Sequence, residues 1–171
     1  GFDIICTSES EITIQKIAKA IQSGTNDFSD IGKIYFKNKF DKIIDNSNFG
    51  EIVLDLDKLP IPAWDLLPNQ RYWEISRPHA GQIKPGTKLR YASMMTSRGC
   101  PFACSYCHIA DEVEGSKSGP IGKFRIKSDE RVREELNILK NDIGVKQVYI
   151  EDDSIFGMKR RAIRLLESII G

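Results

Sequence analysis

The sequence predicts an α/β fold built from parallel strands. Its second half alternates a strand, a cysteine-rich loop, a helix, a second strand and a last helix, which is the order of βα units joined by right-handed crossovers. A strand-like stretch covers residues 89–96, and the next is VKQVYI at 145–150. In parallel sheets and barrels the C-terminal ends of the strands carry the chemistry, so we expect functional residues directly after these two stretches.

The helix between the two strands has clear end signals. Ser128 is a preferred N-cap residue, and Asp129 and Glu130 follow in the first turn, where carboxylates favour the positive end of the helix dipole. Gly144 closes the segment, as a glycine after a last turn does. The final helix has an apolar stripe at helical spacing, formed by Met158, Ala162, Leu165, Leu166 and Ile169.

The first 46 residues predict a strand, a helix and a hairpin. FDII at 2–5 is a short apolar run, and Ser8-x-x-Glu11 fits a capping box at the start of the helix that Gly24 closes. Two β-rich runs flank Lys37–Lys39, which favours a hairpin. This order is typical of the end of an α/β domain.

A proline-rich linker follows from residue 47 to residue 87. Its prolines exclude a long helix; they are Pro60, Pro62, Pro68, Pro78 and Pro85. It also holds too many large apolar residues for a disordered tether, so we expect it to pack against a neighbouring domain. These residues are Ile61, Trp64, Leu66, Leu67, Tyr72 and Trp73. The predicted domains are therefore 1–46, the linker 47–87, and 88–171.

Charge and hydropathy exclude several classes of partner. With 25 basic and 24 acidic residues the net charge is +1, so no nucleic acid partner is expected from the overall field. The run Lys159–Arg161 fits a solvated helix face. No apolar stretch is long enough to span a bilayer and no signal peptide is present, which predicts a cytoplasmic protein with reduced thiols. A start without Met and an end inside a helical pattern indicate a fragment.

Three cysteines and a histidine crowd into CPFACSYCH at 100–108. The last five residues match the C-x-x-C-H pattern of covalent haem attachment, but that leaves Cys100 unused and requires export. Structural zinc wants four ligands in two separated pairs, whereas Cys6 lies in another predicted domain and His108 directly follows a ligand. Three thiolates suit a four-iron cluster with one open iron, and an open iron can bind a substrate.

The pattern C-x-x-x-C-x-aromatic-C after a strand resembles that of the radical SAM enzymes. The upstream run LPIPAWDLLP at 59–68, followed by TSRGCPFACSYCH, is similar to the junction between a cobalamin-binding domain and the radical SAM barrel in cobalamin-dependent members. The resemblance covers nearly the whole chain. It implies the C-terminal end of a Rossmann-like cobalamin-binding domain, a linker, and the first βα units of a (β/α) partial TIM barrel.

The same resemblance implies roles for individual residues. The expected ligands of a 4Fe-4S cluster are Cys100, Cys104 and Cys107. Tyr106 takes the aromatic position, which packs near the adenine of S-adenosylmethionine. The acids after the second strand are candidates to contact the amino group of that cosubstrate, and the family's common glycine-glycine-acid form is absent, so the choice stays open among Glu151, Asp152 and Asp153. Arg98 either balances charge at the cofactors or pairs with a nearby acid.

The implied activity is reductive cleavage of S-adenosylmethionine to a 5'-deoxyadenosyl radical, in cobalamin-dependent methyl transfer or related radical chemistry on a small organic substrate. It needs an electron donor such as flavodoxin or ferredoxin. The cobalt-ligating histidine loop of many members would lie before Gly1, so we expect this chain alone to bind no cobalamin and to be inactive. The alternatives are a radical methylthiotransferase acting on RNA or protein, and a non-enzymatic iron-sulfur electron carrier.

Overall fold

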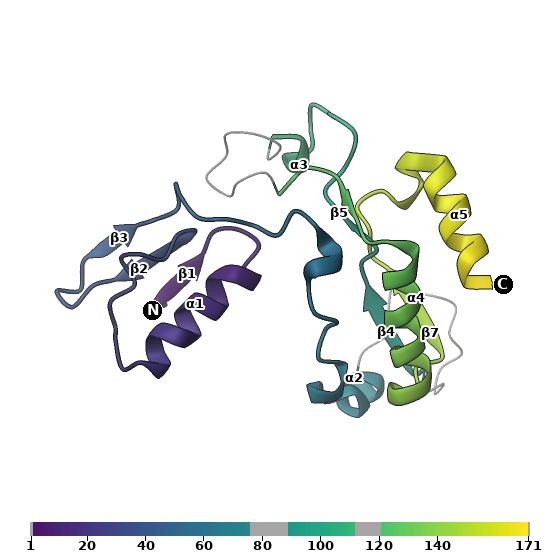
Figure 1. Ribbon diagram of the computed structural model, residues 1–171, viewed down its shortest axis with the longest axis horizontal. Coiled ribbons are helices and arrows are strands. Elements are labelled where there is room, and N and C mark those ends of the chain that lie inside the picture. The colour runs from purple at the N-terminus through teal and green to yellow at the C-terminus, as the bar shows by residue number, and fades with distance from the viewer. Residues whose placement is uncertain (1, 76–88, 112–120, 171) are drawn as a thin grey trace. The chain divides into compact units, whose positions relative to one another are not determined.

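The computed structural model describes residues 2–75, 89–111 and 121–170 (Figure 1). Contacts divide the chain into two compact units, one of residues 1–56 with 98–125 and one of residues 57–97 with 126–171. Each unit has its own hydrophobic core. The cysteine loop groups with the N-terminal elements. The strands Tyr91–Met94 before it and Gln147–Ile150 after it belong to the second unit. The predicted boundaries after residues 46 and 87 stay predictions.

The first unit contains a three-stranded antiparallel sheet with order β1-β2-β3. Its elements are β1 (Ile4–Cys6), α1 (Glu11–Gln22), β2 (Ile34–Lys37) and β3 (Ile43–Asp45). The predicted strand, helix and hairpin are confirmed. Cys6 pairs with Ile34, so α1 and the loop after it return the chain to the end of the sheet that β1 has just reached. The pairing is therefore antiparallel, unlike the parallel crossover of a Rossmann-like unit.

Side chains from α1, the following loop and β2 form the core of this unit. The buried members are Ile17, Phe28, Ile31, Ile34 and Phe36. Phe28 and Phe36 meet edge to face with ring centroids 5.8 Å apart, an arrangement that aromatic quadrupoles favour. The period-2 burial of β2 places Ile34 and Phe36 under the helix and leaves Lys37 exposed.

The predicted capping box at the start of α1 is wrong. The helix begins at Glu11, its N-cap residue is Ser10 rather than Ser8, and the Ser10 side chain caps no backbone N–H group. The Ser10 hydroxyl instead donates to the Ser8 carbonyl at 3.0 Å. Glu11 would have to be the third helical residue to complete a capping box, and its carboxylate is held by a distant arginine (see below).

The second unit is built on a parallel pair of strands, β4 (Tyr91–Met94) and β7 (Gln147–Ile150). Met94 pairs with Ile150, so both strands end at the same edge, and the predicted parallel pairing is confirmed. Figure 1 shows α4 beside this pair. Within the described residues, the unit also contains 3-10 turns before β4 and after β7, α2 (Asn69–Ile75), α4 (Asp129–Ile138), a π-helical turn (Leu139–Ile143) and α5 (Lys159–Ile170). Two short strands, β5 (Ser97–Arg98) and β6 (Arg125–Ile126), pair with each other, and α3 spans His108–Asp111.

The predicted ends of α4 are confirmed. The Ser128 hydroxyl accepts a hydrogen bond from the Arg131 N–H at 3.1 Å, and its backbone is extended, as an N-cap requires. The helix continues through the π-helical turn and stops at Gly144, whose φ of 78° lies in the left-handed region. These signals fix the length of the helix that separates β4 from β7.

The predicted linker packs onto the second unit through its two tryptophans. Trp64 and Trp73 lie against the core, whose buried members are Ala92, Met94, Val132, Leu139, Val145 and Leu165. The Trp73 indole N–H also donates to the Tyr91 carbonyl at 2.8 Å, at the start of β4. Leu66 is 79% exposed, so it does not take part. The end of the linker, with Pro78 and Pro85, lies outside the described residues, as do residues 112–120.

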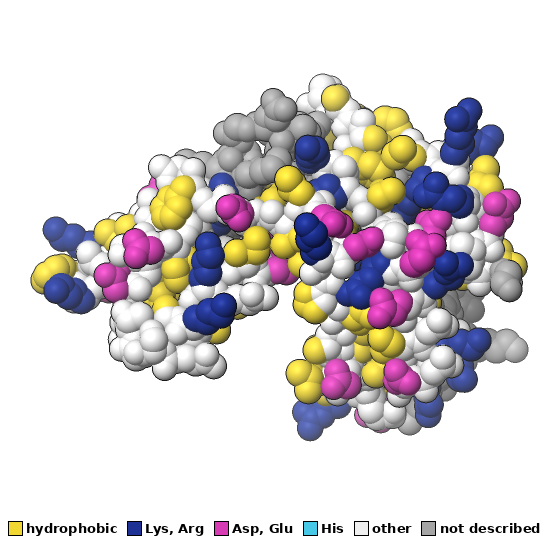
Figure 2. Space-filling model, viewed as in Figure 1, with side chains coloured by type: hydrophobic (Ala, Val, Ile, Leu, Met, Phe, Trp, Pro, Cys, Tyr) yellow, Lys and Arg dark blue, Asp and Glu magenta, His cyan; other side chains and the backbone are white. Residues whose placement is uncertain are grey.

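Charged side chains of both signs are interspersed over the face drawn in Figure 2, as the almost balanced composition predicts. Among the residues with described positions, no helix combines the length and the apolar character that crossing a membrane requires.

Candidate functional site

The three clustered cysteines lie on the loop that runs from β5 to α3. All three thiols are free and half-buried. The Cys100 N–H donates to the Gly122 carbonyl at 3.2 Å, which ties the start of the loop to the segment that returns from it. The Cys107 N–H donates to the Cys104 carbonyl at 3.0 Å and closes a turn between these two cysteines.

Gly99 is required where the chain enters this loop. Its φ of 72° is one that residues with a side chain rarely adopt. A Cβ atom here would also lie 2.5 Å from the carbonyl oxygens of both Gly122 and Lys123. The two stems of the loop therefore approach each other more closely than any side chain at Gly99 would allow.

The donor set fits a thiolate-ligated iron-sulfur cluster, because three reduced cysteines of one loop carry the right ligand atoms and the right spacing. The thiols do not form a ready-made metal site. Within the described ranges, no three side chains of His, Cys, Asp or Glu are close enough to share a metal ion. The loop thus supplies ligands that binding would have to draw together.

A partly buried ionic network holds both stems of this loop. Glu9, just before α1, accepts from the Arg98 guanidinium at 2.9 Å and from the two terminal nitrogens of Arg125 at 2.9 and 2.5 Å. The other terminal nitrogen of Arg98 donates a hydrogen bond to the Glu11 carboxylate at 2.6 Å. The second interpretation of Arg98, an ion pair with an acid, is the one the structure shows.

Arg125 is the most enclosed member of this network, with 5% of its side chain exposed. Besides Glu9, it donates to the carbonyls of Val53, Ile121 and Lys123 at 2.9 to 3.1 Å. Its guanidinium therefore joins three separate segments of the chain, and its bidentate contact with Glu9 is the geometry that arginine and carboxylate favour.

The network shifts the pKa values of two of its members. Burial by itself raises the pKa of Glu9, but the hydrogen bonds and charges of Arg125, and then of Arg98, outweigh it, so the pKa lies below the usual 4.5. Burial lowers the pKa of Arg98, but its hydrogen bond to Glu11 and the charges of Glu9 and Glu11 more than reverse this effect, so the pKa lies above its usual value. Both groups are therefore ionised at neutral pH.

In the second unit, Asp152 is wholly taken up by contacts at the ends of β4 and β7. Its carboxylate accepts from the backbone N–H and the hydroxyl of Thr96 at 2.6 and 2.5 Å, and from those of Ser97 at 3.1 and 2.7 Å. No part of the Asp152 side chain is exposed. This carboxylate joins the exit of β4, three residues before Cys100, to the exit of β7.

Arg161 balances the charge of Asp152 from α5. It lies 3.5 Å from the carboxylate and donates to the carbonyl and hydroxyl oxygens of Thr96 at 3.0 and 2.7 Å. Only 3% of the residue is exposed, so the expectation that the run Lys159–Arg161 is a solvated face is wrong at Arg161. A buried carboxylate requires a compensating charge, and this arginine supplies it.

The remaining predicted site residues are more accessible. Glu151 is half-buried and accepts from the Ser93 hydroxyl at 3.1 Å, and Asp153 is exposed. Tyr106 is 91% exposed on the cysteine loop. The expectation that functional residues lie directly after both predicted strands stays a prediction.

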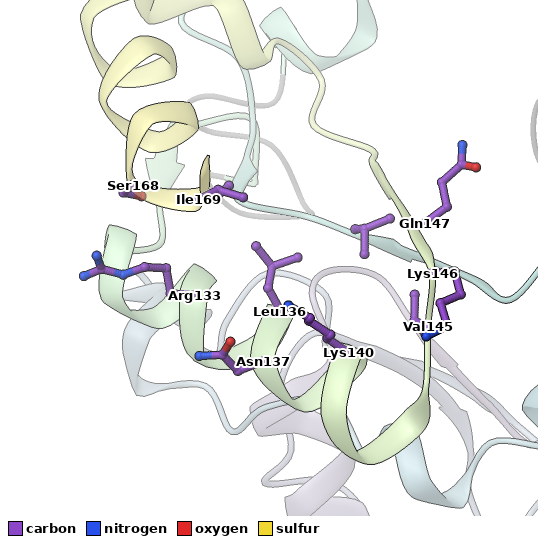
Figure 3. Close-up of a pocket in the computed structure, with 10 residues that line it drawn as sticks. Arg133, Leu136, Asn137, Lys140, Val145, Lys146, Gln147, Ser168 and Ile169 are labelled. Carbon is purple, nitrogen blue, oxygen red and sulfur yellow. The ribbon is translucent and has the colours of Figure 1, made fainter. Parts of the chain in front are cut away.

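A separate hollow of about 520 Å³ lies between α4, β7 and α5 in the second unit (Figure 3). Leu136, Val148 and Ile169 form its apolar wall, and basic side chains such as Arg133 and Lys140 surround it. It contains none of the predicted site residues, so it does not bear on the chemistry of the cysteine loop.

Sequence reasoning missed Glu9, Arg125, Thr96 and Ser97. Glu9 and Arg125 are 116 residues apart, and no local spacing links such a pair. The sequence did contain a weak indication of Thr96 and Ser97. Both are hydroxyl residues that follow one predicted parallel strand, and the three acids follow the strand beside it.

The sequence is similar to curated methyltransferases. It is 32% identical over 162 residues to an uncharacterized methyltransferase of Pyrococcus horikoshii, which covers 94% of this chain and 30% of that protein. It is 31% identical over 101 residues to the cytidylyl-2-hydroxyethylphosphonate methyltransferase of Streptomyces wedmorensis, covering 59% of this chain and 17% of that protein. The chain thus spans less than a third of the length of these relatives. No protein-family profile matches it.

Two solved structures match almost the whole chain. One is the cobalamin-dependent S-adenosylmethionine radical enzyme OxsB with aqua-cobalamin bound. The match covers 98% of this chain and 21% of OxsB, with a TM-score of 0.66 and 18% identity. The chain's mixed α/β fold therefore matches one part of this cobalamin-dependent enzyme over about 98% of the chain's own length. The other is the radical S-adenosylmethionine methyltransferase TsrM of Kitasatospora setae, with cobalamin and a [4Fe-4S] cluster bound. The match covers 98% of this chain and 30% of TsrM, with a TM-score of 0.57 and 16% identity.

Proposed function

We propose that this chain is part of a cobalamin-dependent radical SAM methyltransferase that acts on a small organic substrate. The observation that carries the proposal is the cysteine loop itself. Its pattern C-x-x-x-C-x-x-C begins shortly after β4, a strand of a parallel pair, in a chain whose fold matches cobalamin-dependent radical SAM enzymes over about 98% of its length. Similarity to curated methyltransferases agrees with this assignment and argues against a simple electron carrier.

In this proposal Cys100, Cys104 and Cys107 hold a 4Fe-4S cluster. When bound, the cluster and S-adenosylmethionine would supply one-electron chemistry, and cobalamin would supply methyl-group chemistry. An electron donor such as flavodoxin or ferredoxin completes the proposed system. The protein's own task is to hold the loop rigidly, orient the cosubstrate and exclude water.

The environments of the three acids after β7 limit which of them can contact the amino group of S-adenosylmethionine. The carboxylate of Asp152 is buried and already accepts four hydrogen bonds from Thr96 and Ser97, which leaves it no access to a cosubstrate. Glu151 and Asp153 flank it and are accessible to different degrees. We therefore assign the proposed contact to Glu151 or Asp153. Tyr106, exposed on the loop, keeps its proposed place beside the adenine.

The test is anaerobic iron-sulfur reconstitution of the natural full-length protein, followed by electron paramagnetic resonance of the dithionite-reduced sample. We expect a 4Fe-4S signal that changes when S-adenosylmethionine is added, and loss of this signal in Cys104→Ala. Cys6→Ala is the matched control, because Cys6 is a half-buried cysteine of β1 outside the loop, and it should keep the signal. Stoichiometric zinc uptake, or a cluster that does not respond to the cosubstrate, would exclude the proposal.

A further inference from the structure

We infer that Glu9 is a positioning residue that holds both stems of the cysteine loop in the arrangement needed for cluster binding. The inference rests on the proposed function and extends it to a residue 91 positions before the first expected ligand, Cys100. Glu9 touches none of the expected ligands. It acts through Arg98, which precedes Gly99 and Cys100, and through Arg125, on the segment that returns from the loop.

The contacts of Glu9 converge from the two ends of the loop onto one carboxylate. One oxygen accepts from both Arg98 and Arg125 at 2.9 Å, and the other accepts from Arg125 at 2.5 Å. With 15% of its side chain exposed, Glu9 is largely shielded from competing water. Loss of this carboxylate would leave the two guanidinium groups facing each other, and their repulsion would push the stems apart.

The charges of this network explain why its role is positional. Arg98 and Arg125 contribute two positive charges, and Glu9 with Glu11 contributes two negative ones, so the network is neutral as a whole. A neutral network has little field with which to balance a charged cofactor. What it does provide is fixed geometry, because Arg125 also binds the carbonyls of Val53, Ile121 and Lys123.

The packing of the stems shows why their separation matters. Gly99 lies against the carbonyls of Gly122 and Lys123, and the Cys100 N–H donates to the Gly122 carbonyl at 3.2 Å. From the same segment, Arg125 donates to the carbonyls of Ile121 and Lys123, the residues on either side of Gly122. If the stems separate, the Cys100 hydrogen bond to Gly122 is lost, and the first ligand loses its fixed position relative to the other two.

The test compares Glu9→Gln, Glu11→Gln and Glu135→Gln in the natural full-length protein. Among the described residues, Glu11 pairs with Arg98, at one stem, so its substitution should have a smaller effect. Glu135 is a buried carboxylate of α4 that pairs with Lys127 at 2.6 Å in the other unit, so it is the control for loss of a buried ion pair elsewhere.

The first measurement is amide hydrogen exchange of the cluster-free proteins over residues 98–107. We expect exchange to become about tenfold faster in Glu9→Gln, the change that a loss of about 1.4 kcal/mol from the closed loop produces, and to stay unchanged in Glu135→Gln. Unchanged exchange in Glu9→Gln would overturn the inference. Should this variant unfold the N-terminal unit, Glu9→Asp, which keeps the charge but is one methylene shorter, takes its place.

The second measurement is the rate at which a chelator removes iron from the reconstituted proteins, together with the paramagnetic resonance line shape of the reduced cluster. We expect Glu9→Gln to lose iron several times faster and to show an altered line shape, because its ligands are less well fixed. A wild-type protein that forms no cluster would sink the proposed function, while the exchange experiment would still decide the role of Glu9. A cluster identical in wild type and Glu9→Gln would reject the positioning role alone.

Discussion

At the scale of single residues, the three consecutive acids after β7 differ in burial and in hydrogen bonding. Asp152 is enclosed and accepts four hydrogen bonds, Glu151 is half-buried, and Asp153 is exposed. A buried carboxylate that loses its charge leaves a compensating arginine unpaired, which costs several kcal/mol, whereas an exposed carboxylate contributes little. The roles of these residues therefore follow from their environments.

Substitution of Asp152 tests this difference. We expect Asp152→Asn to lower the free energy of unfolding by about 3 kcal/mol, because Arg161 stays buried without its partner and the Thr96 and Ser97 donors lose a charged acceptor. Urea denaturation followed by circular dichroism measures the change. Asp153→Asn is the neighbouring control and should stay within about 0.5 kcal/mol of wild type. Equal effects of the two substitutions would contradict the assignment of Asp152 as the buried anchor.

The depressed pKa of Glu9 predicts a specific response to acid. Its folded-state pKa lies below 4.5, so the folded protein releases this proton more readily than the unfolded chain does. The stabilisation that ionised Glu9 provides is fully present above the pKa that Glu9 has in the unfolded chain. It is lost as the pH falls through the lower folded-state pKa. The difference in unfolding free energy between wild type and Glu9→Gln should therefore shrink from about pH 6 to about pH 3.5 in urea titrations. A difference that grows in acid would refute the sign of this shift.

At the scale of elements, the entry to the cysteine loop depends on a glycine for two reasons that can be separated. Gly99 has a positive φ and carbonyl oxygens 2.5 Å from the position of a Cβ, whereas Gly24, after α1, has a φ of 78° and no atom within 4 Å of that position. Conformation disfavours alanine at both sites, but only Gly99 adds a steric clash.

Alanine at these two glycines should therefore have unequal costs. We expect Gly24→Ala to destabilise the protein by about 1 kcal/mol, the cost of the left-handed conformation alone. Gly99→Ala should cost clearly more, because backbone carbonyls must move, and it should reduce the iron retained after reconstitution. Thermal unfolding and iron analysis of both variants give the comparison. Equal stability losses would show that the approach of Gly122 and Lys123 is not rigid.

At the scale of the whole molecule, the chain divides into two units with separate cores, and the cysteine loop belongs with the N-terminal elements. The domain predicted from the sequence, residues 88–171, groups the loop with the strands around it, and that division stays a prediction. Arg98 and Arg125 give the physical reason for the division that contacts show, since both bind acids near the start of α1.

Separate cores predict localised effects of large-to-small substitutions. Ile34 and Leu165 are fully buried in the first and second core, and each change to alanine should cost about 2–5 kcal/mol. We expect Ile34→Ala to speed hydrogen exchange mainly in residues 2–56, and Leu165→Ala mainly in residues 126–170. Each variant is the control for the other. Loss of protection throughout both units in either variant would show that they unfold as one.

Much of the fold and part of the site could be predicted because their signals are local. Ser128 and Gly144 act on the helix turn beside them, the apolar runs of β4 and β7 imply a parallel pair, and the cysteine spacing identifies a candidate ligand set. Comparison with known proteins supports the radical SAM fold that this spacing implied. Such features need only a few neighbouring residues, so the sequence by itself determined them.

Only the tertiary structure decided which charged residues pair and which are buried. Glu11 has the spacing of a capping box, yet its carboxylate binds Arg98, because a charged partner with two donors outcompetes a single backbone N–H group. Glu9 and Arg125 meet across 116 positions, and Asp152 is buried between two exits that only strand pairing brings together. Long-range ion pairs leave no periodic trace in a sequence, since their geometry exists only once the chain has folded.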